Sequence, residues 1–202
     1  MNNNPVVSLN ESEALPVSEF TNDTTSPELL SFDLDLTTEI LTLLFSETVR
    51  VETLDVGQVT IQDRLAANSD LYWRLRGGEV ITNDSTVVMI RLNNDDLNEI
   101  KIRSSVATFE NITHISVTNR FIQDMNENFI SPISSMNPIP VSIFMEDIVS
   151  PELDSFNLDM DGSGLLTLSF SESVNVSTLD VTQITIMVAA GNTDVALSLI
   201  HI

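Results

Sequence analysis

The sequence lacks cysteine altogether, and it is poor in aromatic and basic side chains. Without cysteine, the chain can form no disulfide, no catalytic thiolate and no zinc site built on thiolates. It has nine phenylalanines, one tyrosine and one tryptophan, so a core must rest mainly on leucine, isoleucine, valine and phenylalanine. Hydrophobic residues still make up 42% of the 202 residues, which is enough for a packed interior and excludes global disorder.

Targeting segments are missing as well. Residues 1–5 lack the basic and apolar regions of a secretory signal. No apolar run approaches the roughly 18 residues that a membrane-spanning helix needs. We therefore expect no membrane insertion within this segment. We also expect the chain to be a fragment of a larger protein whose secretion signal lies elsewhere.

Charge is strongly one-sided, with 30 acidic and eight basic residues and a net charge of −22. All eight basic residues lie between Arg50 and Arg120. Such a field repels phosphate backbones and anionic membrane surfaces, so we expect no nucleic-acid partner. It attracts cations, and Ca²⁺ is the candidate cofactor outside the cell. Solvation of the exposed carboxylates is the ordinary alternative.

An internal repeat is the strongest feature of the sequence. Residues 26–61 and 150–186 align with one inserted residue after Met160, and 23 of 36 positions are identical. Upstream, residues 16–20 resemble residues 140–144, and Asp23 aligns with Asp147, which gives a period of about 124 residues. The repeat predicts three parts: residues 1–23 as the C-terminal tail of a preceding repeat, residues 24–147 as a complete repeat, and residues 148–202 as the truncated start of the next.

Apolar residues alternate with polar ones along most of one repeat, which is typical of half-buried strands. The inward positions that this alternation predicts are Phe32, Leu34, Leu36, Leu41, Leu43, Phe45, Val59, Ile61, Val88, Ile90, Leu92, Ile115 and Val117. Leu44 and His114 lie at the alternate, outward positions of their strands, so we expect both to face solvent. Residues 94–101 carry acids at the start and a base at the end, which predicts one short helix per repeat. Roughly seven strands in such a repeat predict an all-β fold, an Ig-like antiparallel β-sandwich in tandem.

Two motifs resemble those of bacterial Ig-like domains, which occur in S-layer proteins and large adhesins. Residues 43–49 with Thr53 and Leu54 resemble their F-S-E-x-V…T-L signature, and residues 124–128 resemble a late D-x-x-G-N turn. The resemblance implies a non-enzymatic structural or adhesive segment of an extracellular or cell-surface protein. The partners it implies are neighbouring Ig-like repeats, cell-surface proteins or glycans.

Acidic residues supply the candidate metal ligands. Asp159, Asp161 and Ser163, with Gly162 between them, resemble the first half of a Ca²⁺ loop, but Phe170 occupies the position of the closing glutamate. An ordinary Asp/Gly hairpin turn explains these residues equally well. Asp23 and Asp147 lie at the predicted junctions between repeats, where acids either bind Ca²⁺ or form solvated linkers.

Tyr72 and Trp73, close to Arg74 and Arg76, are the candidate ligand-binding residues, because aromatic rings and guanidinium groups can stack on a sugar. Trp73 is two residues before Leu75, however, and so lies on the same face of a strand, which predicts a core position. His114 is the only imidazole away from the C-terminus, and no nucleophile–base set is visible. We therefore expect no enzyme activity. The alternative function is a glycan-binding module or an accessory domain of a large secreted enzyme.

One expectation concerns stability. Residues 148–202 supply only about three strands, too few to cover an apolar face. We predict that this segment is disordered or aggregation-prone in isolation, whereas residues 24–147 fold alone.

Overall fold

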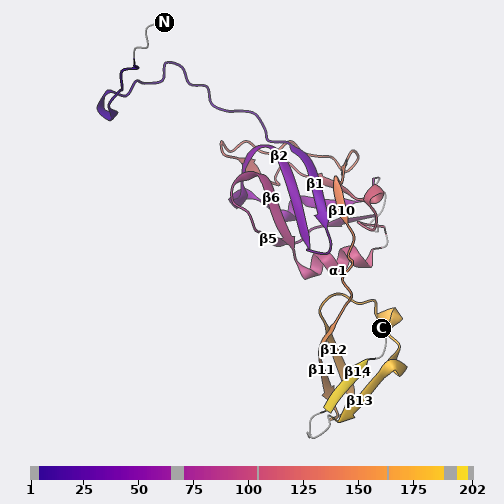
Figure 1. The fold of residues 1–202 in the computed structure, drawn as a ribbon. Coiled ribbons are helices and arrows are strands. Elements are labelled where there is room, and N and C mark those ends of the chain that lie inside the picture. The colour runs from indigo at the N-terminus through magenta and orange to yellow at the C-terminus, as the bar shows by residue number, and fades with distance from the viewer. Residues whose placement is uncertain (1–4, 65–70, 104, 163, 189–194, 200–202) are drawn as a thin grey trace.

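The computed structural model describes residues 5–64, 71–103, 105–162, 164–188 and 195–199. Strands dominate these ranges, and nearly all of their pairings are antiparallel, as the sequence predicts. Residues 5–26 form an exposed, extended segment with one short 3₁₀ turn, η1 (Glu11–Glu13). Figure 1 shows this segment leading away from the body of the protein.

Two sheets are built from residues 29–145 (Figure 1). The larger has the order β10-β1-β2-β6-β5, with β8 also paired to β2, and the smaller has the order β4-β3-β7-β9. The pairing of β1 with β10 is parallel. The bounds of the larger sheet are β1 (Leu29–Asp35), β2 (Ile40–Arg50), β5 (Gly78–Val80), β6 (Ser85–Leu92), β8 (Gln123–Asp124) and β10 (Ile143–Met145). Those of the smaller sheet are β3 (Val59–Gln62), β4 (Tyr72–Arg74), β7 (His114–Val117) and β9 (Ile139–Pro140).

Side chains of both sheets meet in one hydrophobic core. Leu43 of β2 and Ile115 of β7 are fully buried, whereas Leu44, one residue further along β2, is 39% exposed. The alternation predicted for this strand is therefore confirmed. Every inward position predicted above is among the core residues. Burial of one such leucine or isoleucine contributes about 1.5–3 kcal/mol, so these alternating positions dominate the stability of the fold.

Helix α1 (Asn94–Ile102) confirms the predicted helix and ends one residue later. Its N-cap is Asn93, whose side-chain oxygen accepts a hydrogen bond from the backbone N–H of Asp96 at 2.7 Å. Leu97 and Ile100 point into the core. Short 3₁₀ turns link the other elements: η2 (Val51–Thr53), η3 (Val56–Gln58) and η5 (Glu110–Ile112). None of the helices in the described ranges has the length and apolar character needed to cross a bilayer.

The prediction that His114 faces solvent is wrong, because only 7% of this residue is exposed. Its strand β7 is an interior strand, flanked by β3 and β9, and His114 is paired with Gln62 on one side and Pro140 on the other. Gln62 is itself completely buried and donates a hydrogen bond to the carbonyl of Ser135 at 2.9 Å. The alternation of the strand did not predict this burial, because it does not reveal that a distant segment places Ser135 against Gln62, the strand partner of His114.

Four strands follow in the C-terminal segment, not the three expected: β11 (Leu153–Asp159), β12 (Leu165–Phe170), β13 (Ile184–Val188) and β14 (Val195–Leu199). They form two hairpins, β11–β12 and β13–β14, which lie beyond α1 in Figure 1. The turns η6 (Val176–Thr178) and η7 (Val181–Gln183) occupy the places of η2 and η3. Several apolar side chains here are exposed, such as Val176, Val181 and Ile186.

The first of these hairpins repeats β1–β2 pair for pair. Phe32 pairs with Leu43 and Leu34 with Leu41 in one hairpin; the aligned residues pair in the same way in the other. The register shifts after Leu29 in β1 and at the aligned position, after Leu153, in β11. The sequence repeat therefore specifies the same strand register twice, including its irregularity.

Candidate functional site

Three carboxylates gather at the end of the larger sheet that receives the N-terminal segment. Asp23 precedes β1, Glu47 lies in β2, and Asp124 lies in β8. Each contributes an oxygen, and these atoms all lie within 4.8 Å of one another. Asp23 is exposed, Glu47 is half-buried and Asp124 is buried. We call this group the acidic cluster.

A tight turn positions the buried member of the cluster. The Oδ1 atom of Asp124 accepts hydrogen bonds from the backbone N–H groups of Asn126 and Asn128, both at 2.8 Å. Its Oδ2 atom accepts a third, from Nδ2 of Asn128 at 2.8 Å. Glu127 has a φ of 69°, in the left-handed region that favours glycine. Glycine is the usual residue at this place in the D-x-x-G-N turn that the sequence resembles.

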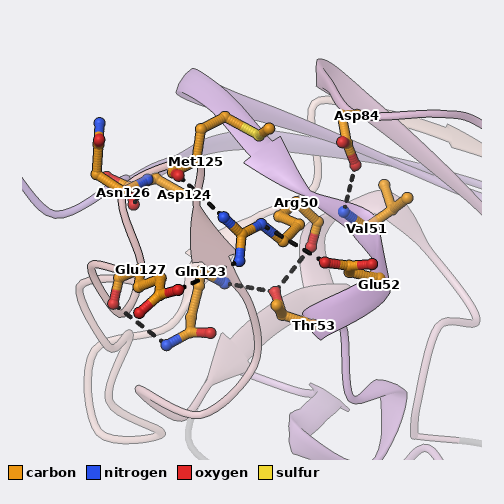
Figure 2. A network of polar contacts seen from close by, with 10 residues as sticks. All are labelled: Arg50, Val51, Glu52, Thr53, Asp84, Gln123, Asp124, Met125, Asn126 and Glu127. Atoms are coloured by element: carbon orange, nitrogen blue, oxygen red, sulfur yellow. Dashed lines mark hydrogen bonds and ion pairs between the residues drawn. The ribbon is translucent and has the colours of Figure 1, made fainter.

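Arg50 fastens this turn to β2, as Figure 2 shows. Its Nη2 donates a hydrogen bond to the carbonyl of Met125 at 3.0 Å, and its Nη1 lies 3.7 Å from a carboxylate oxygen of Glu127. On the other side, Thr53 accepts a hydrogen bond from the backbone N–H of Gln123 at 2.9 Å. The turn thus holds the Asp124 carboxylate next to Glu47 through contacts with residues distant in sequence.

The carboxylates affect one another's protonation. Burial raises the pKa of Glu47, and the negative charges of Asp23 and Asp124 raise it further. The backbone hydrogen bond from Thr25 holds the pKa of Asp23 below its ordinary value. Within the described residues, no ion pair involves any member of the acidic cluster. The cluster therefore concentrates negative charge that a cation would stabilise.

The aligned residues of the second copy make a second site. Asp147 aligns with Asp23 and Glu172 with Glu47, and both contact Lys101 of α1. The Nζ atom of Lys101 lies 2.5 Å from Oδ2 of Asp147 and 3.0 Å from Oε2 of Glu172. All three side chains are at most 20% exposed. We call this group the lysine junction.

Charge pairing governs the pKa values at the lysine junction. Burial alone would lower the pKa of Lys101, but hydrogen bonds with Asp147 and Glu172 outweigh it and the net direction is upward. Burial likewise opposes ionisation of Asp147, and the neighbouring Lys101 ammonium reverses the effect, so its pKa is lowered. Both groups are therefore held in their charged forms.

The other candidate metal ligands lie in an exposed turn. Asp159 Oδ1 accepts a hydrogen bond from the backbone N–H of Asp161 at 2.8 Å, and Gly162 follows with a φ of 86°. Ser163 lies outside the described residues. Asp35, the counterpart of Asp159, accepts equivalent bonds from Thr37 and Thr38. This geometry is that of an Asx turn in both copies.

The candidate ligand-binding aromatics are not equally accessible. Tyr72 is 39% exposed, but Trp73 is only 7% exposed, which confirms its core position. The guanidinium carbons of Arg76 and Arg103 each lie 4.4 Å from the centroid of the Trp73 ring. The indole N–H of Trp73 donates to Oδ1 of buried Asp96 at 2.9 Å. Protein groups therefore already occupy the contacts that Trp73 would offer to a sugar.

Sequence reasoning identified Asp23 and Asp147 but missed the partners with which the fold brings them together. Glu47, Asp124, Glu172 and Lys101 were not predicted as site residues. The sequence held a signal for the two glutamates. Glu47 and Glu172 are aligned in the repeat, and each follows its junction aspartate at the same distance in sequence, apart from the inserted residue. A comparison with protein-family models, curated proteins and solved structures finds no match to this chain.

Proposed function

We propose that the chain is part of a tandem array of Ig-like β-sandwich domains, with a non-enzymatic structural or adhesive role in a large extracellular or cell-surface protein. The observation that carries this proposal is the match between the β1–β2 and β11–β12 hairpins, in sequence, register and bulge. A hairpin that is repeated at this level of detail is best explained as the opening of a second domain of the same kind.

Residues 24–147 have the features expected of one such domain. Two largely antiparallel sheets share one core, and the chain returns through β10 to lie beside β1, where it began. Each domain of this design buries its own apolar face, and its two ends are free to join neighbours.

The N-terminal segment supports the array as well. Val17 and Phe20 are 71% and 75% exposed. Their counterparts in the aligned part of the repeat, Val141 and Phe144, belong to the core or pack against it. Such exposure is expected if the segment is the last strand of another domain whose remaining strands would cover it.

The position of the charged groups favours a structural role over catalysis. The acidic cluster and the lysine junction contain Asp23 and Asp147, the residues at the two junctions that the sequence repeat predicts. At the lysine junction one ammonium pairs with two carboxylates, and such ion pairs fix the orientation of adjoining domains.

Mechanical unfolding tests the proposal. Three copies of residues 24–147 in series, stretched by force spectroscopy, should unfold one at a time. Each event should lengthen the chain by about 40 nm, the extension of 124 residues at about 3.5 Å each less the folded length. A smooth extension without separate unfolding events would contradict the array of independent domains. Leu44→Ala in every copy is the matched control, because this outward change should leave the pattern intact.

A further inference from the structure

Asp23 and Glu47 reproduce the geometry of Asp147 and Glu172. In each copy the aspartate accepts a hydrogen bond from the backbone N–H two residues later, at 2.9 Å from Thr25 and 3.0 Å from Val149. The serine before each glutamate makes the same hydrogen bond in both copies. Ser46 Oγ accepts a hydrogen bond from the backbone N–H of Glu28 at 2.9 Å, and Ser171 Oγ accepts one from the backbone N–H of Glu152 at 2.9 Å. The later pair is occupied by an ammonium, from the only lysine in the sequence.

From this equivalence we infer that the Asp23–Glu47 pair is the binding site for a lysine ammonium on the last turn of an α1 helix in a preceding copy of the same repeat. The inference rests on the proposed array, and it names the partner that the acidic cluster receives there. Asp124, the buried member of the cluster, adds its negative charge to that of the pair.

The ligand chemistry favours an ammonium over Ca²⁺. An ammonium has three N–H donors and needs few acceptors, whereas Ca²⁺ takes six to eight oxygens. Asp124 already accepts three hydrogen bonds within its own turn, which leaves Asp23 and Glu47 to supply most of the free lone pairs. Two carboxylates match the pair of contacts that Lys101 makes at the lysine junction.

The surface around the cluster also matches that junction. At the second copy, Asn94, Leu97 and Asn98 of α1 line a pocket together with residues 170–173. The aligned residues of the first copy include Ser46 and Thr48, which flank Glu47 and are exposed. The same strand end that receives α1 at the second copy is therefore open at the first.

An extended chain tests the inference. Residues 1–146 joined directly to residues 23–202 place a Lys101 ahead of the complete Asp23–Glu47–Asp124 cluster. Segmental ¹³C labelling of the second part then reports the Glu47 carboxyl by NMR. We expect the pKa of Glu47 to lie above its ordinary value in the present chain and to fall by at least one unit in the extended chain. Lys101→Met in the added copy should restore the higher value, while Arg120→Met in that copy, which removes an exposed charge in the turn before β8, should leave the lower one.

Three outcomes separate the inference from the proposed array. If the extended chain folds as two domains and the pKa of Glu47 is the same with Lys101 and with methionine, the inference fails and the array stands. If the added copy does not fold as a domain, the array itself fails. The third outcome comes from a titration of Ca²⁺ alone into the chain of residues 1–202. A saturating shift of the Glu47 resonance below millimolar Ca²⁺, lost in Asp23→Asn, would overturn the lysine assignment in favour of a metal.

Discussion

The ammonium of Lys101, in the last turn of α1, lies 3.0 Å from Oε2 of Glu172, just past the end of β12. This contact joins two parts of the chain that are 71 residues apart. The Asp147 carboxylate completes the group, so a single positive charge is held by two negative ones with little exposure.

The first prediction is that Lys101 and Glu172 are energetically coupled. Lys101→Met and Glu172→Gln should each weaken the protection of the β11 and β12 amides against hydrogen exchange. The double variant should lose less protection than the sum of the two single losses. For a partly buried pair we expect a coupling of about 1–2 kcal/mol. Hydrogen exchange of the β11 and β12 amides measures it. Additive effects would show that the pair is incidental.

The second prediction concerns the pH range of the lysine junction. The pKa of Lys101 is raised, so its contribution is complete below its ordinary value of 10.5 and is lost as the pH rises through the higher folded value. The pKa of Asp147 is lowered, so its contribution is complete above 3.8 and is lost as the pH falls through the lower folded value. Protection of β11 by this contact should therefore be constant between these limits. A decline near pH 6 or 7 would speak against this pairing.

The third prediction is that Glu47→Gln stabilises the present chain at neutral pH. An acid with a raised folded pKa favours the folded state only while it is protonated, below about its ordinary value of 4.5, and that contribution is lost as the pH rises. Removal of the charge should raise the unfolding free energy at pH 7 by up to roughly 0.5 kcal/mol and have no effect near pH 3. Denaturant unfolding at both pH values tests it. Glu110→Gln, an exposed site remote from the cluster, is the control and should show no such pH dependence.

The fourth prediction is that Glu127→Gly stabilises the turn that holds Asp124. A side chain in the left-handed region costs about 1–2 kcal/mol, part of which glycine regains despite its greater freedom when unfolded. We expect a net gain of about 0.5–1 kcal/mol in thermal or denaturant unfolding. Glu127→Ala, which removes the weak pairing with Arg50 but keeps a Cβ atom, should give no gain. An equal gain from alanine would attribute the effect to charge instead of backbone strain.

The fifth prediction compares two neighbouring leucines. Leu43→Ala should cost about 2–5 kcal/mol, because the side chain is fully buried. Leu44→Ala removes the same atoms from the outer face and should cost no more than about 1 kcal/mol. Equal losses in denaturant unfolding would contradict the assignment of the two faces of β2.

Much of the fold could be predicted because it depends on local alternation. Leu41, Leu43 and Phe45 reveal their buried face within five residues, and the repeat shows the same alternation a second time. The helix carries its own signals, acids in its first turn and a base in its last turn. Residues that repeat a local pattern can be placed without knowledge of their distant neighbours.

Burial by distant segments could not be predicted in this way. His114 stands at an outward position of the alternation, yet it is buried in a strand that lies between β3 and β9. The acidic cluster depends likewise on the pairing of β8 with β2, which brings Asp124 to Val49 across 75 residues of sequence. Alternation specifies the face on which a side chain lies, but it does not specify what covers that face.

The central claim is that the repeat in sequence is a repeat of domains, and completion of the second copy tests it most directly. Ile186 aligns with Ile61, so residues 1–186 joined to residues 62–147 supply every strand of a second domain. The claim predicts that β11 and β12 gain the hydrogen-exchange protection of β1 and β2. It also predicts that the calorimetric enthalpy of unfolding rises by roughly 0.7 kcal/mol for each added residue. Unchanged protection of β11 and β12, with the added residues exchanging freely, would contradict it.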